Sequence, residues 1–460
     1  MTDHDDAVGL EQARRKMQDV GVSAEAIDVF SHYYRQLQQG ATGLVREHEI
    51  KPVTELDRLE DVKVDPQRAR DALAQTVQIK LNGGLGTSMG MEKAKSLLPV
   101  REGRSFLDLI VAQVLHARAA YDVGLPLLWM NSFRTRRETL QALENHPDLP
   151  VEGLPADFLQ NQEPKLRADD LTPVSWPQDP QLEWCPPGHG DVYTAIHAAG
   201  LVDRLLQQGY RYAAVSNSDN LGATPDAGLA GWFAESGAPF AMEVCRRTRA
   251  DRKGGHVAWR SSDGRLILRD KAQVHPDDAD RFSDHHLHRY FNTNNLWWDL
   301  EQLKHVLDER GGVLGLPLIR NTKPVDPTDP ESPQVYQIET AMGAAIEVFE
   351  GATAIEVDRS RFLPVKTTND LLVVRSDVYA VGSDGHLEQR SGAVPFVTLD
   401  DAHYKRIDDF EQRFEKGVPS LVGADSLTVD GDWTFGADVT ITGAAHLRGP
   451  GGHVEDGSRL

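Results

Sequence analysis

The chain has 460 residues, of which 49 are basic and 70 are acidic, so its formal net charge at neutral pH is −21. This balance excludes a uniform nucleic-acid binder and a basic membrane-surface protein, although a local basic pocket for phosphates is compatible with it. The two cysteines, Cys185 and Cys245, lie far apart and form no CxxC pair, which excludes a disulfide framework and a thiolate zinc site. No apolar run resembles a signal peptide or a membrane span, so we expect a cytoplasmic protein.

Residues 8–40 are expected to be helical. Ser23 suits an N-cap, and apolar side chains from Ile27 to Leu37 recur on one face of a helix. The following stretch, 46–75, is charged and punctuated by prolines, so we expect it to connect this N-terminal helical segment to the main body.

Strands and helices alternate from residue 76 to residue 380. The patterns predict buried strands near 77–81, 126–130, 212–215 and 240–244, and helices over 105–121 and 227–235. This alternation predicts an α/β fold with a Rossmann-like, mostly parallel sheet that is covered on both faces. Such sheets bind their ligands beyond the carboxyl ends of the strands.

The last fifty residues have a different pattern. Apolar side chains recur every six positions in two series, one running through Leu427, Trp433, Val439 and Ala445 and the other through Val429, Phe435, Ile441 and Leu447. This period predicts a short left-handed parallel β-helix, with a hairpin of chance spacing as the alternative. The tail 448–460 is expected to be frayed. The predicted domains are therefore 1–75, 76–380 and 381–460.

A glycine cluster, Gly83, Gly84, Gly86 and Gly90, directly follows the first strand of the main body. Glycines there let the backbone approach a ligand closely, and their amides can hold phosphate oxygens. The cluster is not a P-loop, since Met91 and Glu92 follow it, and it is not the dinucleotide fingerprint, since Met89 occupies the third glycine position. A tight structural turn is the alternative, but Lys95 in so acidic a chain favours an anionic ligand.

The run 81–90, LNGGLGTSMG, followed by Lys95 and Ser96, resembles the nucleotide-binding loop of the eukaryotic-type UTP–glucose-1-phosphate uridylyltransferase family. Further segments of that family follow in the same order, at 186–193, 216–223, 253–255, 291–297, 337–341 and 359–368. The resemblance implies a GT-A-like nucleotidyltransferase core and a C-terminal β-helix. It also implies UTP and glucose 1-phosphate as substrates, UDP-glucose and pyrophosphate as products, and Mg²⁺ as the cofactor.

Within this resemblance, the nucleotide is held by nine residues: Leu81, Asn82, Gly83, Gly84, Lys95, Gln160, Gly188, Asp219 and Lys366. Gln160 would read the uracil edge, because one amide offers both a donor and an acceptor; Gln162 is the alternative reader. Lys95 and Lys366 are the catalytic candidates, since transfer between two polyanions needs positioning and charge neutralisation and no protein nucleophile.

The resemblance assigns the sugar phosphate to a second set: His189, Asn217, Ser218, Asp219, Lys253, Asn292, Asn294 and Glu339. Asp219 ends a predicted strand and is the expected ligand of Mg²⁺, which takes few carboxylates and completes its shell with phosphates and water. Lys323 is a weaker candidate. The histidines at 285, 286 and 288 are expected to lie in a solvated segment.

Three alternatives remain at this point. The enzyme could accept galactose 1-phosphate or an N-acetylhexosamine 1-phosphate, although the latter branch usually carries an arginine where this chain has Ser88. It could also be a non-catalytic nucleotide-sugar binder. Its assembly could be monomeric or homo-oligomeric through the C-terminal domain.

Overall fold

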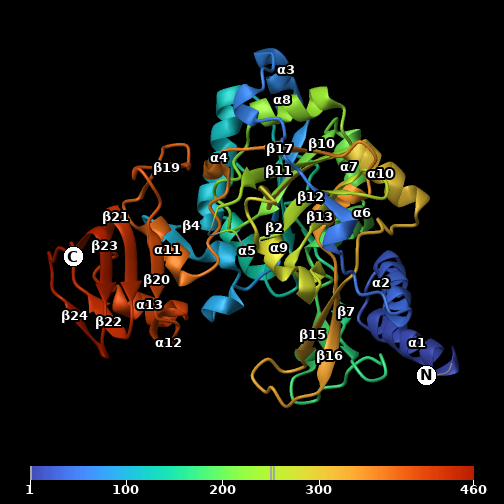
Figure 1. Cartoon of the computed structure of the whole chain (residues 1–460). Coiled ribbons are helices and arrows are strands. Elements are labelled where there is room, and N and C mark those ends of the chain that lie inside the picture. The colour runs from blue at the N-terminus through green and yellow to red at the C-terminus, as the bar shows by residue number, and fades with distance from the viewer. Residues whose placement is uncertain (1–2, 249–250, 252–253) are drawn as a thin grey trace.

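The N-terminal segment forms two helices at the edge of the molecule (Figure 1). The structure, a computed structural model, describes residues 3–248, 251 and 254–460. Helix α1 (Asp3–Asp19) and helix α2 (Ala24–Gln38) are separated at Ser23, whose hydroxyl accepts a hydrogen bond from the Ala26 amide at 3.2 Å. The predicted N-cap is confirmed, because this hydroxyl satisfies an amide that has no partner within the helix.

A mixed sheet of ten strands forms the centre of the molecule. Its main path runs β1 (Ile50–Pro52), β12 (His256–Arg260), β14 (Tyr290–Asp299), β10 (Tyr212–Asn217), β2 (Thr76–Asn82), β5 (Leu127–Asn131) and β6 (Asp157–Leu159). β11 (Phe240–Arg246) adds to β14, β17 (Thr353–Glu356) to β11, and β13 (Leu266–Arg269) to β12. Only β1, β13 and β14 run against the other strands. The expected large, mostly parallel sheet is confirmed.

Helices cover both faces of this sheet, and side chains alternate between the two apolar cores. Trp129 and Ala214 face one core with α3 (Pro66–Ala74), α4 (Phe106–Tyr121) and α8 (Ala227–Ser236). Leu128 and Val215 face the other with α6 (Val192–Ala198), α7 (Leu201–Gln207) and α10 (Leu300–Glu309). This alternation follows from the two-residue period of a strand, and burial on both faces explains the near-continuous apolar runs.

Shorter elements extend the body. A hairpin of β15 (Ile319–Pro324) and β16 (Gln334–Glu339) pairs with β8 (Leu166–Arg167) and projects from one end of the molecule (Figure 1). The remaining small elements are β3 (Pro99–Arg101), β4 (Arg104–Ser105), α5 (Arg136–Leu143), β7 (Glu163–Pro164), β9 (Trp184–Cys185), α9 (Ala279–Ser283), α11 (Thr368–Arg375), β18 (Tyr379–Val381) and β19 (Leu387–Gln389).

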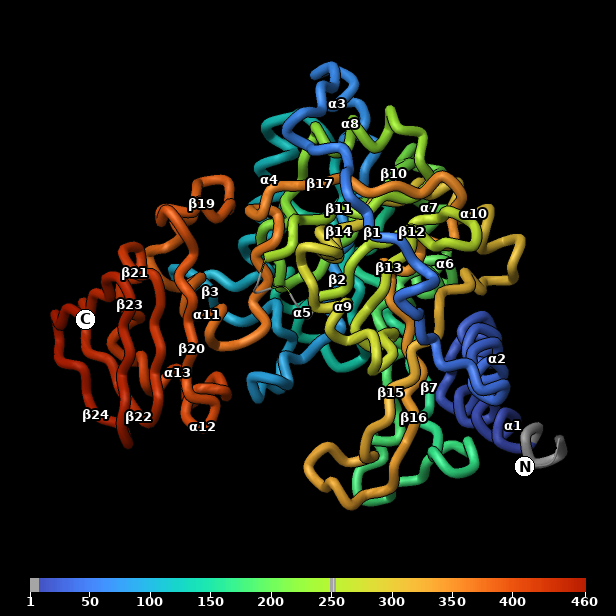
Figure 2. Tube along the Cα trace, viewed as in Figure 1, coloured from blue at the N-terminus to red at the C-terminus, as the bar shows by residue number. Residues whose placement is uncertain are grey.

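The C-terminal strands lie together on the opposite side of the body from α1 and α2 (Figure 2). They are β20 (Phe396–Leu399), β21 (Ser420–Val429), β22 (Asp432–Phe435), β23 (Thr440–Leu447) and β24 (Gly451–Val454), with the short helices α12 (Asp401–Tyr404) and α13 (Ile407–Arg413). β21 pairs with β23 in parallel, and β22 with β24, so Leu427 lies opposite Ala445 and Val429 opposite Leu447. Members of one six-residue series therefore face each other. Closure into a left-handed β-helix stays a prediction.

The expectation of a frayed tail over 448–460 is wrong. β24 lies within it, and the Leu460 amide donates to the Thr440 carbonyl at 2.9 Å. The parallel strand β22 supplies hydrogen-bond partners to the backbone of β24. The Gly- and Pro-rich composition of the tail gives no sign of these partners, because they come from another part of the chain. The same core that lies under α4 also includes Leu427 and Ile441, so the C-terminal strands share buried apolar surface with the main body.

The expectation of a solvated histidine segment is wrong at His288. This side chain is fully buried, its ring stacks on His256 with centroids 3.7 Å apart, and its Nε2 lies 3.1 Å from a Glu47 carboxylate oxygen. Across the part of the chain that the structure describes, no group of three His, Cys, Asp or Glu side chains is arranged to hold a metal ion. Within those same residues, no helix has the length and apolar character needed to cross a membrane.

Candidate active site

Several of the predicted site residues lie at the carboxyl ends of β2 and β10, with β5 beside β2. These strands are parallel neighbours, with Asn217 opposite Leu81 and Asn82 opposite Asn131. The glycine-rich loop (83–90) leaves β2 at this edge, and Asp219 follows the end of β10. Ligands of parallel sheets bind beyond the carboxyl ends of the strands, so the loops at this edge are the candidates to bind one.

One end of the glycine-rich loop meets uncharged amide groups. A Cβ atom on Gly83 would lie 2.4 Å from Oε1 of Gln160, so only glycine lets this amide lie against the backbone. Nε2 of Gln160 donates to the Gly188 carbonyl at 3.0 Å, and its backbone amide donates to the Asn131 carbonyl at 2.7 Å. Gly83, Gln160 and Gly188 form what we call the amide end of the site.

Gly188 allows a close approach between two chain segments. It adopts φ +80°, and a Cβ atom there would lie 2.6 Å from the Thr340 carbonyl oxygen. The Thr340 amide donates to the Pro187 carbonyl at 2.9 Å, and the Gly190 amide donates to the Thr340 carbonyl at 2.8 Å. The end of β16, which carries Glu339, is thereby fixed beside the amide end.

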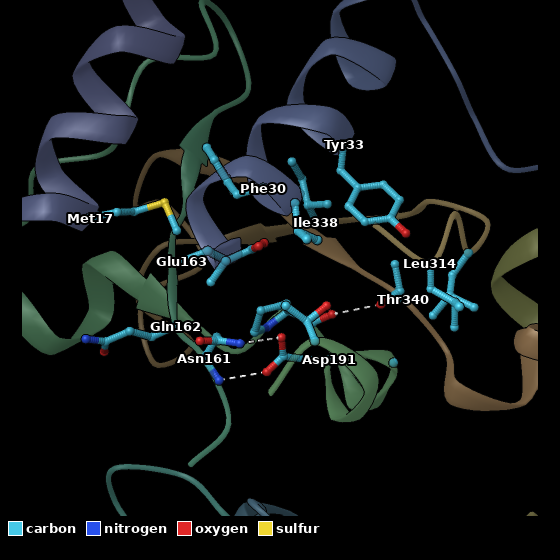
Figure 3. A pocket seen from close by; sticks show the side chains of 16 residues that line it. Met17, Phe30, Tyr33, Asn161, Gln162, Glu163, Asp191, Leu314, Ile338 and Thr340 are labelled. Carbon is cyan, nitrogen blue, oxygen red and sulfur yellow. Dashed lines mark hydrogen bonds between the residues drawn. The ribbon is translucent and has the colours of Figure 1, made fainter. Parts of the chain in front are cut away.

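Gln162, the alternative reader, lies elsewhere. It lines a pocket together with Asn161, Glu163 and Asp191 (Figure 3). Side chains of α1 and α2, among them Met17, Phe30 and Tyr33, line the other side of the same pocket. Asp191 accepts hydrogen bonds from the backbone amide of Asn161 at 2.7 Å and from its Nδ2 at 2.9 Å. Gln160 therefore contacts the glycine-rich loop at Gly83, whereas Gln162 lines this pocket. Asp191 holds Asn161, the residue next to Gln160.

Buried carboxyls line this pocket. Burial raises the pKa of Asp191 to about 6, against the hydrogen bonds from Asn161. Burial, and then the carboxylates of Asp191 and Glu339, raise the pKa of Glu163 well above its ordinary value. With a pKa of about 6, Asp191 can change its charge near neutral pH.

Asn82 and Ser218 point into the interior. Nδ2 of Asn82 donates to Asn131 at 2.8 Å and to Thr139 at 2.9 Å, and the Ser218 hydroxyl donates to Oδ1 of Asn82 at 3.2 Å. Both side chains are buried. They hold the strand ends together, and their backbone is the part that remains for a ligand.

The other end of the loop is charged. Nζ of Lys95 lies 2.7 Å from Oδ2 of Asp219, and both side chains are partly exposed. The Lys95 amide also donates to the Gly84 carbonyl at 3.3 Å, which ties the lysine to the glycine-rich loop.

Lys366 belongs to the same region. The Val365 amide donates to the Asp219 carbonyl at 3.2 Å, and the Ser88 hydroxyl of the loop donates to the Lys366 carbonyl at 3.4 Å. The Lys366 side chain is exposed, and its charge partly offsets the burial that raises the pKa of Asp270. Lys95, Asp219 and Lys366 form the charged end of the site.

His189 follows Gly188 of the amide end and is uncharged at neutral pH. Its Nδ1 accepts a hydrogen bond from the Met342 amide at 2.9 Å, and burial lowers its pKa to about 4. The proton of the neutral ring therefore sits on Nε2, which can donate to a ligand oxygen.

The remaining sugar-side candidates lie on β14 and β16. Nδ2 of Asn292 donates to Oδ1 of Asn294 at 2.7 Å, and Asn294 adopts φ +60° beside an irregularity in the pairing of β11 with β14. Asn292 packs closely against Gly343, since a Cβ atom on that glycine would lie 2.9 Å from Nδ2 of Asn292. Gly343 follows Met342, whose amide binds His189, so the two asparagines lie near His189. Lys253 lies outside the described residues.

Comparison with known proteins decides the family. Residues 27–442 match the UDPGP family of UTP–glucose-1-phosphate uridylyltransferases. The chain belongs to this family. Its members are enzymes of the nucleotidyltransferase class, and nucleotidyl transfer by such enzymes typically needs a divalent metal.

Relatives and solved structures agree with the family match. The chain is 37% identical over 463 residues to the UTP–glucose-1-phosphate uridylyltransferase of Hordeum vulgare, covering 98% of this chain and 95% of that protein. It is 38% identical over 430 residues to the probable enzyme of Schizosaccharomyces pombe, covering 91% and 82%. A Leishmania major UDP-glucose pyrophosphorylase mutant in complex with UDP-glucose superimposes with a TM-score of 0.92, at 42% identity and with 98% of each chain covered.

The charged end suits a divalent cation of the kind this family's chemistry needs. Asp219 offers one carboxylate at the strand edge, and Mg²⁺ typically takes one or two carboxylates together with phosphates and water.

The family site rests on a buried polar network that sequence analysis did not identify. Nδ2 of Asn220 donates to Asn295 at 3.0 Å and to the Arg361 carbonyl at 3.1 Å, while its Oδ1 accepts from the Leu363 amide at 2.8 Å. Arg361 in turn pairs with the buried Glu243 at 2.6 Å. One asparagine thus links the turn of Asp219, strand β14 and the segment that leads to Lys366.

Proposed function

We propose that this chain transfers a uridylyl group from UTP to glucose 1-phosphate and releases pyrophosphate. The observation that carries the proposal is the juxtaposition, along one glycine-rich loop, of the Gly83–Gln160 contact and the Lys95–Asp219 pair. An uncharged amide next to a bare backbone suits a flat base, and a lysine with a carboxylate suits phosphates with a metal.

In the proposed reaction, a phosphate oxygen of glucose 1-phosphate attacks the α-phosphorus of UTP. The new P–O bond forms as the bond to the oxygen of the β-phosphate breaks, and pyrophosphate leaves with the electron pair. The attacking oxygen is already ionised at neutral pH, so no general base is needed. Catalysis then consists of alignment and charge stabilisation.

Each residue has a role in this scheme. Gln160 binds the uracil edge, with Gly83 and Gly188 beside it, and Nε2 of His189 donates to the sugar phosphate.

At the charged end, Lys95 leaves Asp219 to contact the UTP phosphates, and Lys366 stabilises the charge that develops in the transition state. Asp219 is the residue that would hold Mg²⁺, which when bound neutralises charge on the phosphate oxygens.

The sugar is proposed to lie against β14 and β16. Asn217, Asn292, Asn294 and Glu339 supply amides and a carboxylate for its hydroxyls, and a role for Lys253 remains part of the proposal. Ser88 in the loop argues against an N-acetylhexosamine. A broader sugar range that includes galactose 1-phosphate is the second candidate.

The organisation of the protein is also proposed. We assign 1–75, 76–380 and 381–460 as domains, with a left-handed β-helix at the C-terminus and a monomer or a homo-oligomer formed through it. The two unpaired cysteines, both buried, fit a reducing compartment such as the cytoplasm.

The test is pyrophosphate release from UTP and Mg²⁺ with glucose 1-phosphate, galactose 1-phosphate and N-acetylglucosamine 1-phosphate. We expect rapid, Mg²⁺-dependent release with glucose 1-phosphate and strong loss in Asp219→Ala. Comparable rates with the other sugars would indicate a broader UDP-sugar enzyme. Measurable UTP binding without release from any sugar would overturn the proposal in favour of a non-catalytic binder.

A further inference from the structure

The far end of the glycine-rich loop is in contact with the C-terminal segment. Gly90 adopts φ +69°, and a Cβ atom there would lie 3.1 Å from both Cζ and Nη1 of Arg406. The guanidinium of Arg406 therefore lies directly against the loop backbone, two residues beyond the Ser88 that touches the Lys366 segment.

Arg406 is held in this position by a well-packed element. It stands between α12 and α13 as the residue preceding the first helical position of α13. Tyr404 and Phe410, on either side of it, are completely buried, and the Asp400 carboxylate before α12 accepts from the Gly431 amide at 2.8 Å. The backbone that presents the arginine is thus fixed by the C-terminal core.

The Arg406 guanidinium is exposed and has no ion pair or hydrogen bond to any of the residues that the structure describes. Other arginines nearby are paired: Arg375 lies 2.7 Å from Glu411, and Arg413 lies 2.8 Å from Asp432. In a chain of net charge −21, an unpaired arginine against the glycine-rich loop leaves a positive charge available to an anionic ligand. Its planar fork of donors matches phosphate oxygens.

The direction of the bound nucleotide follows from the two ends of the loop. If the base lies at Gly83, the α-phosphate lies near Lys95 and Asp219, and the terminal phosphates extend toward residues 88–90. We propose that Arg406 binds the β- and γ-phosphates of UTP, and equally free pyrophosphate. This inference rests on the proposed function and adds a residue of the C-terminal segment to the site.

The experiment measures KM in both directions of the reaction for Arg406→Ala. We expect KM for UTP and for pyrophosphate to rise about 10-fold, as for the loss of a hydrogen bond to a charged group. KM for UDP-glucose and for glucose 1-phosphate should not change, because neither contains the β- and γ-phosphates. Arg406→Lys should recover part of the loss.

The control is Arg390→Ala, which removes an exposed arginine of the same segment away from the loop and should leave all four KM values unchanged. An equal rise in KM for UDP-glucose would overturn the inference, since Arg406 would then only hold the loop. Unchanged KM values for UTP and pyrophosphate in an active Arg406→Ala enzyme would also overturn it. An inactive wild-type enzyme would instead contradict the proposed function.

Discussion

At the amide end of the site, Gln160 lies against Gly83 and donates a hydrogen bond to the Gly188 carbonyl, so the contacts join uncharged groups, whereas at the charged end Lys95 and Asp219 pair across 2.7 Å. The amide end is pre-formed, because Gln160 is anchored through its backbone and its side chain. The charged end is expected to rearrange, since in the proposed reaction Lys95 moves from Asp219 to the UTP phosphates. We infer that the amide end sets affinity and the charged end sets rate.

The largest effect is expected from Lys366→Ala. Removing a charge that acts in the transition state typically lowers kcat by about 10²-fold to 10³-fold. Pyrophosphate release under saturating substrates measures this loss, and UDP-glucose affinity should stay close to that of the wild type. Lys63→Ala, which removes an exposed lysine outside the loop and outside every predicted site segment, is the control. A near-normal kcat would remove Lys366 from the charged end.

Asp219→Asn should give the next largest effect. The neutral amide keeps the shape but loses the charge that would hold Mg²⁺ and pairs with Lys95. We expect kcat/KM to fall about 100-fold and part of the loss to be recovered at high Mg²⁺ concentration. A Mg²⁺ titration of the rate checks this. An unchanged Mg²⁺ requirement would mean that the metal is held elsewhere.

Gln160→Ala tests the amide end. Two lost hydrogen bonds to the base, each worth about 0.5–1.5 kcal/mol, should weaken UTP binding about 10-fold to 100-fold while kcat at saturation changes little. Gln162→Ala is the matched control and should bind UTP normally, because Gln162 lines the pocket behind the site. The reverse order of effects would make Gln162 the reader. Calorimetric titration with UTP separates the two.

The smallest effect is a pH dependence of the amide end. Below its pKa of about 6, Asp191 is protonated and loses one of its hydrogen bonds from Asn161. We expect UDP-glucose, which has no phosphate that titrates near this pH, to bind about threefold more weakly at pH 5 than at pH 7.5. Asp191→Asn should remove this dependence, and its persistence in that variant would exclude Asp191.

The same proton has the opposite effect on stability. The pKa of Asp191 is higher in the folded chain than in the unfolded chain, so the folded state binds more protons between about pH 4 and pH 6. Asp191 therefore raises the free energy of unfolding as the pH falls through 6. Denaturation of the wild type and Asp191→Asn at several pH values isolates this contribution, which should be absent from the variant.

Local patterns made much of the fold predictable. Burial on both faces gave apolar runs at β2, β5, β10 and β11, and Ser23 and Ser105 mark helix starts because their hydroxyls cap backbone amides. The tail and His288 were predicted wrongly because their partners come from distant segments. The Thr440 carbonyl orders the tail, and Glu47 contacts the buried histidine.

The site was predictable only in part for the same reason. The family motifs point to Gly83, Gln160 and Lys366 along the sequence as candidates, but the proposal of Gln160 over Gln162 as the uracil reader rests on the contact with Gly83. Nothing in the local sequence distinguishes Arg406 from other exposed arginines, since its significance comes from Gly90, more than three hundred positions earlier. Long-range contacts of this kind carry no local pattern.

The separation of affinity from rate is tested most directly by one side-by-side measurement on Gln160→Ala and Lys366→Ala. Each variant is titrated calorimetrically with UDP-glucose, and its rate of pyrophosphate release is then measured at saturating substrates. The account predicts weak binding with a nearly normal saturated rate for Gln160→Ala, and normal binding with a severely reduced rate for Lys366→Ala. Equal losses of binding and rate in both variants would contradict it.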